Sequence, residues 1–82
     1  MNKIKELKTD YQYIEMNLLS QTEKTQCWAV RNKKSQLLLG RVGWSGAWRQ
    51  YIFEPWENTI FSKGCLEDIC YFIKQLMDKR KK

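Results

Sequence analysis

The sequence contains no histidine, so it lacks the side chain that most often serves as a general acid or base near neutral pH. Glu54 and Glu57 flank Pro55 and Trp56, and two carboxylates in such a turn are typical of solvated surface charge. The remaining residues supply neither a nucleophile paired with a base nor a glycine-rich phosphate loop. We therefore expect a protein that is not an enzyme and that uses no cofactor.

Cysteines are few and odd in number, namely Cys27, Cys65 and Cys70. Their spacing fits neither a zinc site nor a redox motif, so no metal site is predicted. Cys65 and Cys70 are five residues apart on a predicted helix, where side chains do not align for pairing. The sequence shows no secretory signal and no apolar run long enough to span a bilayer. These features predict a reduced, cytoplasmic protein without membrane contact, whose thiols act as small buried hydrophobic groups.

Positive charge is in excess only at the two ends of the chain. The formal net charge is +6, yet residues 9–78 hold eight basic and eight acidic side chains. The terminal cations are Lys3, Lys5 and Lys8 at the start and Lys79, Arg80, Lys81 and Lys82 at the end. We expect a single domain, 1–82, with an ordered body at about 10–78 and flexible basic termini at 1–8 and 79–82. The four C-terminal cations are either auxiliary phosphate contacts or solubilising charges.

The apolar pattern predicts four strands. Ile14, Met16 and Leu18 alternate with polar residues, as in a half-buried strand at residues 13–19. The other expected strands are 26–31, 36–44 and 48–54, and Pro55 ends the last because proline has no N–H to donate. Gly46 supplies the conformational freedom for the second hairpin turn. Residues 2–18 also fit a helical spacing, so the sequence leaves open whether they begin as helix or strand.

A helical apolar stripe follows from about residue 64 to residue 79. Ser62 or Gly64 is the expected cap, and Glu67 and Asp68 are expected in the first turn. The stripe consists of Leu66, Ile69, Cys70, Ile73, Leu76 and Met77. Because a sheet needs a cover, the predicted fold class is α+β, a four-stranded antiparallel sheet (ββββ) packed on one C-terminal α-helix.

Hairpin pairing of Arg31 with Gln36 and of Trp44 with Trp48 divides the predicted sheet into two faces. The bulkier face, expected under the helix, holds Trp28, Val30, Leu37, Leu39, Tyr51 and Phe53, with Arg41 and Arg49 at its far end. The shallow face holds Cys27, Ala29, Leu38, Gly40, Val42 and Ile52, bordered by Trp44 and Trp48. Such an apolar face is seldom left in water, so Ala29, Leu38, Gly40, Val42 and Ile52 are expected to form a homodimer interface. The reverse assignment, with the helix on the shallow face, stays open.

The segment from Trp28 onward resembles a group of short, mostly uncharacterised phage and prophage proteins with a strand, hairpin and helix pattern. The matching elements are Leu39-Gly40-Arg41, Trp44, Trp48-Arg49-Gln50-Tyr51, Phe53, Pro55, Thr59-Ile60-Phe61, Gly64-Cys65-Leu66, Asp68-Ile69 and Phe72-Ile73. Residues 1–25 lie outside the resemblance. It implies an origin in a bacteriophage or mobile element and action inside a bacterial host, and it carries no activity with it.

Two function hypotheses follow, and both use Arg41, Trp44, Trp48, Arg49 and Tyr51. The first is a non-enzymatic module that binds single-stranded nucleic acid, with the aromatic rings stacked on bases and the arginines on phosphates. This architecture is similar to that of small transcriptional-coactivator-like single-strand binders, which dimerise. The second is a phage-encoded inhibitor of a host defence or nuclease machine, with the same aromatic patch as its protein contact. The basic ends favour nucleic acid as the partner, and the neutral body favours a host protein.

Overall fold

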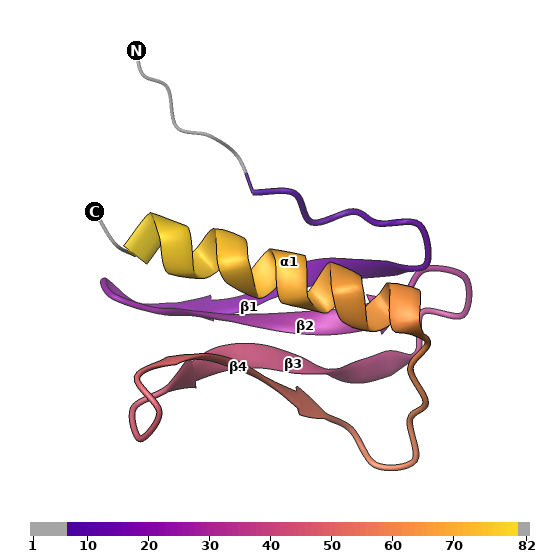
Figure 1. Cartoon of the computed structure of the whole chain (residues 1–82). Helices are drawn as coiled ribbons and strands as arrows, with labels where there is room; N and C mark the ends of the chain where they lie inside the picture. Colours follow the sequence, from indigo (N-terminus) through magenta and orange to yellow (C-terminus); the bar gives the residue numbers. More distant parts are fainter. Residues whose placement is uncertain (1–6, 81–82) are drawn as a thin grey trace.

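Four strands form a single antiparallel sheet in which each strand pairs with its neighbour in sequence, and one helix lies across one face (Figure 1). The elements of this computed structural model are β1 (Ile14–Gln21), β2 (Gln26–Asn32), β3 (Leu38–Ser45), β4 (Gln50–Pro55) and α1 (Lys63–Arg80). The structure describes residues 7–80. The predicted fold class is therefore confirmed, and residues 14–18 belong to a strand; residues 2–6 lie outside the described part.

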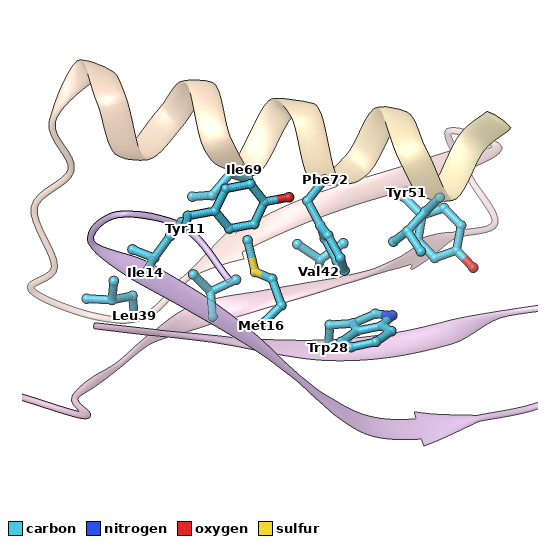
Figure 2. Close-up of a cluster of buried hydrophobic side chains, with 11 residues drawn as sticks. Tyr11, Ile14, Met16, Trp28, Leu39, Val42, Tyr51, Ile69 and Phe72 are labelled. Atoms are coloured by element: carbon cyan, nitrogen blue, oxygen red, sulfur yellow. The ribbon is translucent and has the colours of Figure 1, made fainter. Parts of the chain in front are cut away.

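The hydrophobic core lies between α1 and the sheet (Figure 2). Phe72 of α1 is fully buried, and its ring packs edge-on against Trp28, with 5.1 Å between the ring centroids. The strands contribute Ile14, Met16, Trp28, Val30, Leu39, Val42 and Tyr51, and α1 contributes Ile69, Phe72 and Leu76. The core is thus built from every strand and closed by a single helix.

The buried stripe of α1 is rotated from the predicted one. Ile69 and Leu76 are buried as expected, but Phe72 stands at the centre of the contact, whereas Leu66 and Cys70 are exposed. Ser62 caps the helix, since its Oγ accepts a hydrogen bond from the Cys65 N–H. The first turn holds no acidic residue, so the predicted carboxylates there are wrong.

The register of β3 differs from the prediction at both hairpins. Arg31 pairs with Leu38 rather than Gln36, Leu39 is bulged, and Trp44 pairs with Tyr51 rather than Trp48. A shift by an odd number of residues turns a strand's side chains to the opposite face. From Gly40 onward β3 is therefore inverted relative to the prediction, while the predicted faces of β2 and β4 are correct.

This inversion puts Gly40, Val42 and Trp44 under α1 and puts Arg41 on the uncovered side of the sheet, here called the open face. Gly40 and Val42 are buried, so their predicted place in a dimer interface is wrong. A Cβ on Gly40 would collide with the Glu54 carbonyl and lie 2.8 Å from the Phe53 ring, so close packing requires glycine here. On the open face Ala29 is buried by its neighbours, and only Leu38 and Ile52 of the predicted set are partly accessible.

The segment before β1 lies against α1. The side-chain amide of Gln75 accepts a hydrogen bond from the Lys8 N–H at 2.9 Å and donates one to the Lys8 carbonyl at 3.1 Å. Tyr11, on the same segment, is buried in the core. Lys8 is therefore bonded to α1, and at the other end Lys79 and Arg80 belong to the last turn of α1. The rest of the predicted tails, residues 1–6 and 81–82, lies outside the described residues.

Candidate nucleic-acid interface

The β3–β4 turn and the last turn of α1 lie at the same end of the molecule (Figure 1), and cationic and aromatic side chains from β3, the turn and α1 line a hollow there. Trp44 comes from β3, Trp48 and Arg49 from the turn, and Lys79 and Arg80 from α1. We call these five residues the basic-aromatic cluster. The sequence places them on three separate segments, and the antiparallel pairing of β3 with β4 and the length of α1 bring them together.

Arg80 and Trp44 form the centre of this cluster. The guanidinium carbon of Arg80 lies 3.8 Å from the centroid of the Trp44 ring, and Arg80 Nη1 donates a hydrogen bond of 2.6 Å to the Lys24 carbonyl. Trp44 in turn packs edge-on against Tyr51, with 5.4 Å between centroids. The guanidinium is therefore held over an indole, and a guanidinium has five N–H donors, which suits recognition of a phosphate oxygen.

The β3–β4 turn presents Trp48 to solvent. Ser45 organises the turn, because its carbonyl accepts a hydrogen bond from the Arg49 N–H at 2.7 Å and its Oγ accepts one from the Trp48 N–H at 3.1 Å. Arg49, and not the predicted Gly46, takes the left-handed conformation, with φ of 57°. Trp48 is 69% exposed, so a large apolar ring on an ordered turn is accessible to solvent.

Two hollows adjoin the cluster and share Arg80. One, of ≈ 430 Å³, is lined by Trp44, Gly46, Arg49, Met77 and Arg80. The other, of ≈ 490 Å³, lies between α1 and the β1–β2 loop; we call it the loop groove, and its lining includes Lys24, Tyr51, Leu76, Lys79 and Arg80. Together the two linings contain four cations and one carboxylate, Glu23. Folding thus creates a local excess of positive charge that the neutral count for residues 9–78 does not reveal.

No carboxylate among residues 7–80 forms an ion pair with Arg49, Lys79 or Arg80; the four pairs found there involve other cations. The charges of the cluster are therefore not neutralised within the described part of the protein. A cationic surface with an exposed indole can hold a phosphate and stack an aromatic base. This arrangement offers a surface for binding.

Of the five predicted binding residues, Trp44 and Arg49 line one hollow together, and Trp48 lies beside Arg49 on the exposed β3–β4 turn. Tyr51 is only 5% exposed and its hydroxyl accepts a hydrogen bond from the Gln26 N–H, so it supports the cluster from below and does not present a ring for stacking. Arg41 lies on the open face, where its Nε donates to Glu54 at 2.6 Å. That hydrogen bond, with the charge of Glu54, holds the pKa of Arg41 above its ordinary value.

Of the four predicted phosphate contacts at the end of the chain, two belong to the cluster. Lys79 and Arg80 belong to the last turn of α1 and to the cluster, whereas Lys81 and Lys82 lie outside the described residues. The sequence does contain a signal for Arg80. It follows Leu76 by four residues and Met77 by three, so a helix that continued past residue 79 would turn Arg80 toward the sheet.

Two further properties bear on partners. Within residues 7–80, no helix is long and apolar enough to cross a bilayer. The same part of the chain contains no group of three or more histidine, cysteine, aspartate or glutamate side chains positioned to hold a metal ion.

Comparison with known proteins finds a relative in a phage. The chain is 39% identical over 59 residues to a protein of Acholeplasma phage L2 described as an uncharacterized 9.3 kDa protein. The match covers 72% of this chain and 76% of the relative. No protein-family model matches the chain, and no solved structure matches it.

Proposed function

Because the chain belongs to the same family as this protein of Acholeplasma phage L2, we propose that it is a non-enzymatic phage accessory protein that binds single-stranded nucleic acid inside the bacterial host cell. The observation that supports binding is the stack of Arg80 on Trp44, beside Arg49 and Lys79 and without a carboxylate partner within residues 7–80. A strand of nucleic acid supplies both the anionic groups and the flat rings that such a surface fits.

Each side chain of the cluster has a separate role in the proposed complex. Arg80, Arg49 and Lys79 contact phosphates, and Trp48 stacks on an unpaired base, a contact worth about 1–3 kcal/mol. Trp44 holds the Arg80 guanidinium in place and so positions it. A duplex keeps its bases stacked inside, so it gains the phosphate contacts without the Trp48 contact.

The open face of the sheet is a poorer site for nucleic acid. Cross-strand pairing puts Glu15 opposite Arg31 and Arg41 opposite Glu54, so its charges balance. Its remaining strand residues are not aromatic, because Trp28, Trp44, Tyr51 and Phe53 all point toward α1. The protein therefore differs from single-strand binders that use an exposed aromatic sheet face, and the end of the sheet takes that role.

A fluorescence anisotropy titration with a labelled single-stranded oligonucleotide tests this function. Arg49→Ala should weaken binding and flatten the dependence of log affinity on log salt by roughly 0.7, the value for one single-strand phosphate contact. Arg41→Ala is the matched control, because it removes the same charge from the open face. Absence of binding at low salt, or equal effects of the two substitutions, would rule out the proposed interface.

A second candidate function is inhibition of a host defence or nuclease machine by protein contact. The 69% exposed indole of Trp48 on an ordered turn favours it, because such rings are common anchors of protein interfaces. A pull-down from the bacterial host, followed by nuclease treatment, distinguishes the two functions. A stoichiometric host protein that survives nuclease and is lost with Trp48→Ala would favour inhibition.

A further inference from the structure

The segment between β4 and α1, residues 56–62, projects from the end of the molecule opposite the basic-aromatic cluster (Figure 1). We call it the crossover loop. Trp56 is 59% exposed and Ile60 is 91% exposed. Both are large apolar side chains, and their exposure on one short loop is unfavourable in an isolated monomer.

The crossover loop is held in one conformation by its own hydrogen bonds. The Trp56 N–H donates to the Leu39 carbonyl, and the Thr59 hydroxyl donates to the Trp56 carbonyl, both at 2.8 Å. Asn58 takes the left-handed conformation, with φ of 59°, and Phe61 anchors the end of the loop against Phe53. Its apolar side chains are therefore presented in advance of any contact, which lowers the entropy cost of binding.

The loop groove at the other end of the molecule has a complementary charge. Most of its lining is polar, Lys24, Lys79 and Arg80 supply positive charge, and the core residues Tyr51 and Leu76 are only 5% and 3% exposed. Glu23 is the one carboxylate in the lining. The crossover loop carries the opposite set, apolar side chains from Trp56 and Ile60 and a single charged residue, Glu57.

We propose that the crossover loop of one copy of the protein docks into the loop groove of a second copy. In this contact Ile60 packs toward Tyr51 and Leu76, and Glu57 faces the cationic lining. The absence of any cation in residues 56–62 disfavours nucleic acid or an anionic membrane as the partner of this loop. Because loop and groove are different surfaces, the contact is heterologous and repeats head to tail, forming a ring or an open row.

The contact does not depend on the proposed nucleic-acid function. The loop groove and the hollow beside Trp44 share Arg80 but otherwise have different lining residues. The loop groove also contains Lys79, so docking and nucleic acid would compete for two of the proposed phosphate contacts, Lys79 and Arg80.

Sedimentation equilibrium over a range of protein and salt concentrations tests the docking. The wild type should associate at high protein concentration, and less so at high salt. Ile60→Ser should weaken association by roughly 30-fold, the effect of removing a central interface anchor. Tyr13→Ser should associate like the wild type, because Tyr13 is a 54% exposed side chain that lies outside both the crossover loop and the loop groove. A wild type that remains monomeric throughout, or equal association of Ile60→Ser and wild type, would overturn the proposal.

A mixing experiment distinguishes this geometry from a symmetric contact of two loops. Ile60→Ser retains a working groove, and Lys24→Glu retains a working loop while reversing one charge of the groove. Each variant alone should be mainly monomeric, and their mixture should form a one-to-one pair that grows no further. Failure of the mixture to pair would overturn the head-to-tail contact.

Oligonucleotide affinity of Ile60→Ser, measured below the concentration of self-association, should equal that of the wild type. This readout separates the two proposals, because loss of self-association with retained oligonucleotide binding supports the docking. Equal loss of oligonucleotide binding at these concentrations would contradict the assignment of the loop to protein contact. Unchanged thermal melting of each variant serves as the control for folding.

Discussion

The guanidinium of Arg80 lies over the indole of Trp44, with 3.8 Å between the guanidinium carbon and the ring centroid. This contact joins the end of α1 to β3. Elsewhere α1 contacts the sheet through its buried apolar side chains. At an exposed site a cation stacked on tryptophan contributes about 0.5–1 kcal/mol. Its larger consequence is positional, since it fixes a cation at the edge of both hollows.

Substitutions of Arg80 should separate its charge from its stacking. Arg80→Ala should weaken oligonucleotide binding and flatten the salt dependence by roughly 0.7, because one phosphate contact is lost. Arg80→Lys should keep that salt dependence but bind less tightly, since an ammonium does not lie flat on the indole and makes no forked hydrogen bonds. Anisotropy titrations at several salt concentrations measure both quantities. Identical behaviour of the two variants would show that the stack has no role in binding.

Gly40→Ala should destabilise the fold. The added methyl group meets the Glu54 carbonyl and lies 2.8 Å from the Phe53 ring, and overpacking of this kind costs about 1–3 kcal/mol. Gly46→Ala is the matched control, because a Cβ there has no neighbour within 4 Å. Urea unfolding of both variants measures the difference. Equal midpoints would mean that β3 and β4 separate easily at this point.

Removal of the Phe72 ring should unfold much of the protein. Phe72 is fully buried against Trp28, and Phe→Ala in a core costs about 3–5 kcal/mol, a large part of the stability of so small a domain. Cys70→Ala, an exposed position two residues earlier, should change the free energy of unfolding by at most about 0.5 kcal/mol. Circular dichroism during thermal melting distinguishes the two. A Phe72→Ala variant with an unchanged midpoint would contradict the observed rotation of α1.

The protein should lose stability in alkaline solution through Tyr11. Burial, with the nearby Tyr71 and Asp68, raises the pKa of the Tyr11 phenol from 10.0 to about 12. The unfolded chain then releases this proton at lower pH than the folded protein. The contribution of the phenol is therefore complete below about pH 10 and is lost as pH rises toward 12.

Thermal melting across this pH range tests the Tyr11 prediction. Tyr11→Phe should show a smaller fall in melting temperature between pH 10 and 12 than the wild type. The substitution also removes hydrogen bonds to the Lys8 carbonyl and from Gln75, so its melting temperature at neutral pH is lower and serves as the reference. Parallel falls in the two proteins would assign the alkaline loss to other groups.

The order of elements was predictable because it depends on local signals. Alternation in Ile14, Met16 and Leu18 is typical of a strand, and Ser62 before an apolar helical stripe marks the start of a helix. Those signals act over a few residues and need no knowledge of the rest of the molecule. The order of four strands and one C-terminal helix could therefore be predicted, while residues 2–18 stayed open between helix and strand.

The faces of the sheet were not predictable in the same way. The bulge at Leu39 and the four-residue turn Gly46–Arg49 each move the pairing of β3 by an odd number of residues, and neither has a decisive local signature. For this reason Arg41 and Val42 were assigned to each other's faces. The candidate site was partly predictable, since Trp48 and Arg49 are adjacent in the chain. Arg80 was assigned to a tail because the helix was predicted to end at about residue 79, so its helical spacing from Leu76 and Met77 was not taken into account.

The sequential order of the strands has a consequence for how the chain folds. Every strand pairs with its neighbour in sequence, so the sheet can form by successive closure of short hairpins, and such local pairing favours rapid folding. The helix that covers Trp28, Val30 and Val42 is the last element of the chain. During synthesis the sheet therefore precedes its cover, and its apolar side remains exposed until Phe72 and Leu76 have been made. A chain shortened before α1 would keep that surface open and would aggregate.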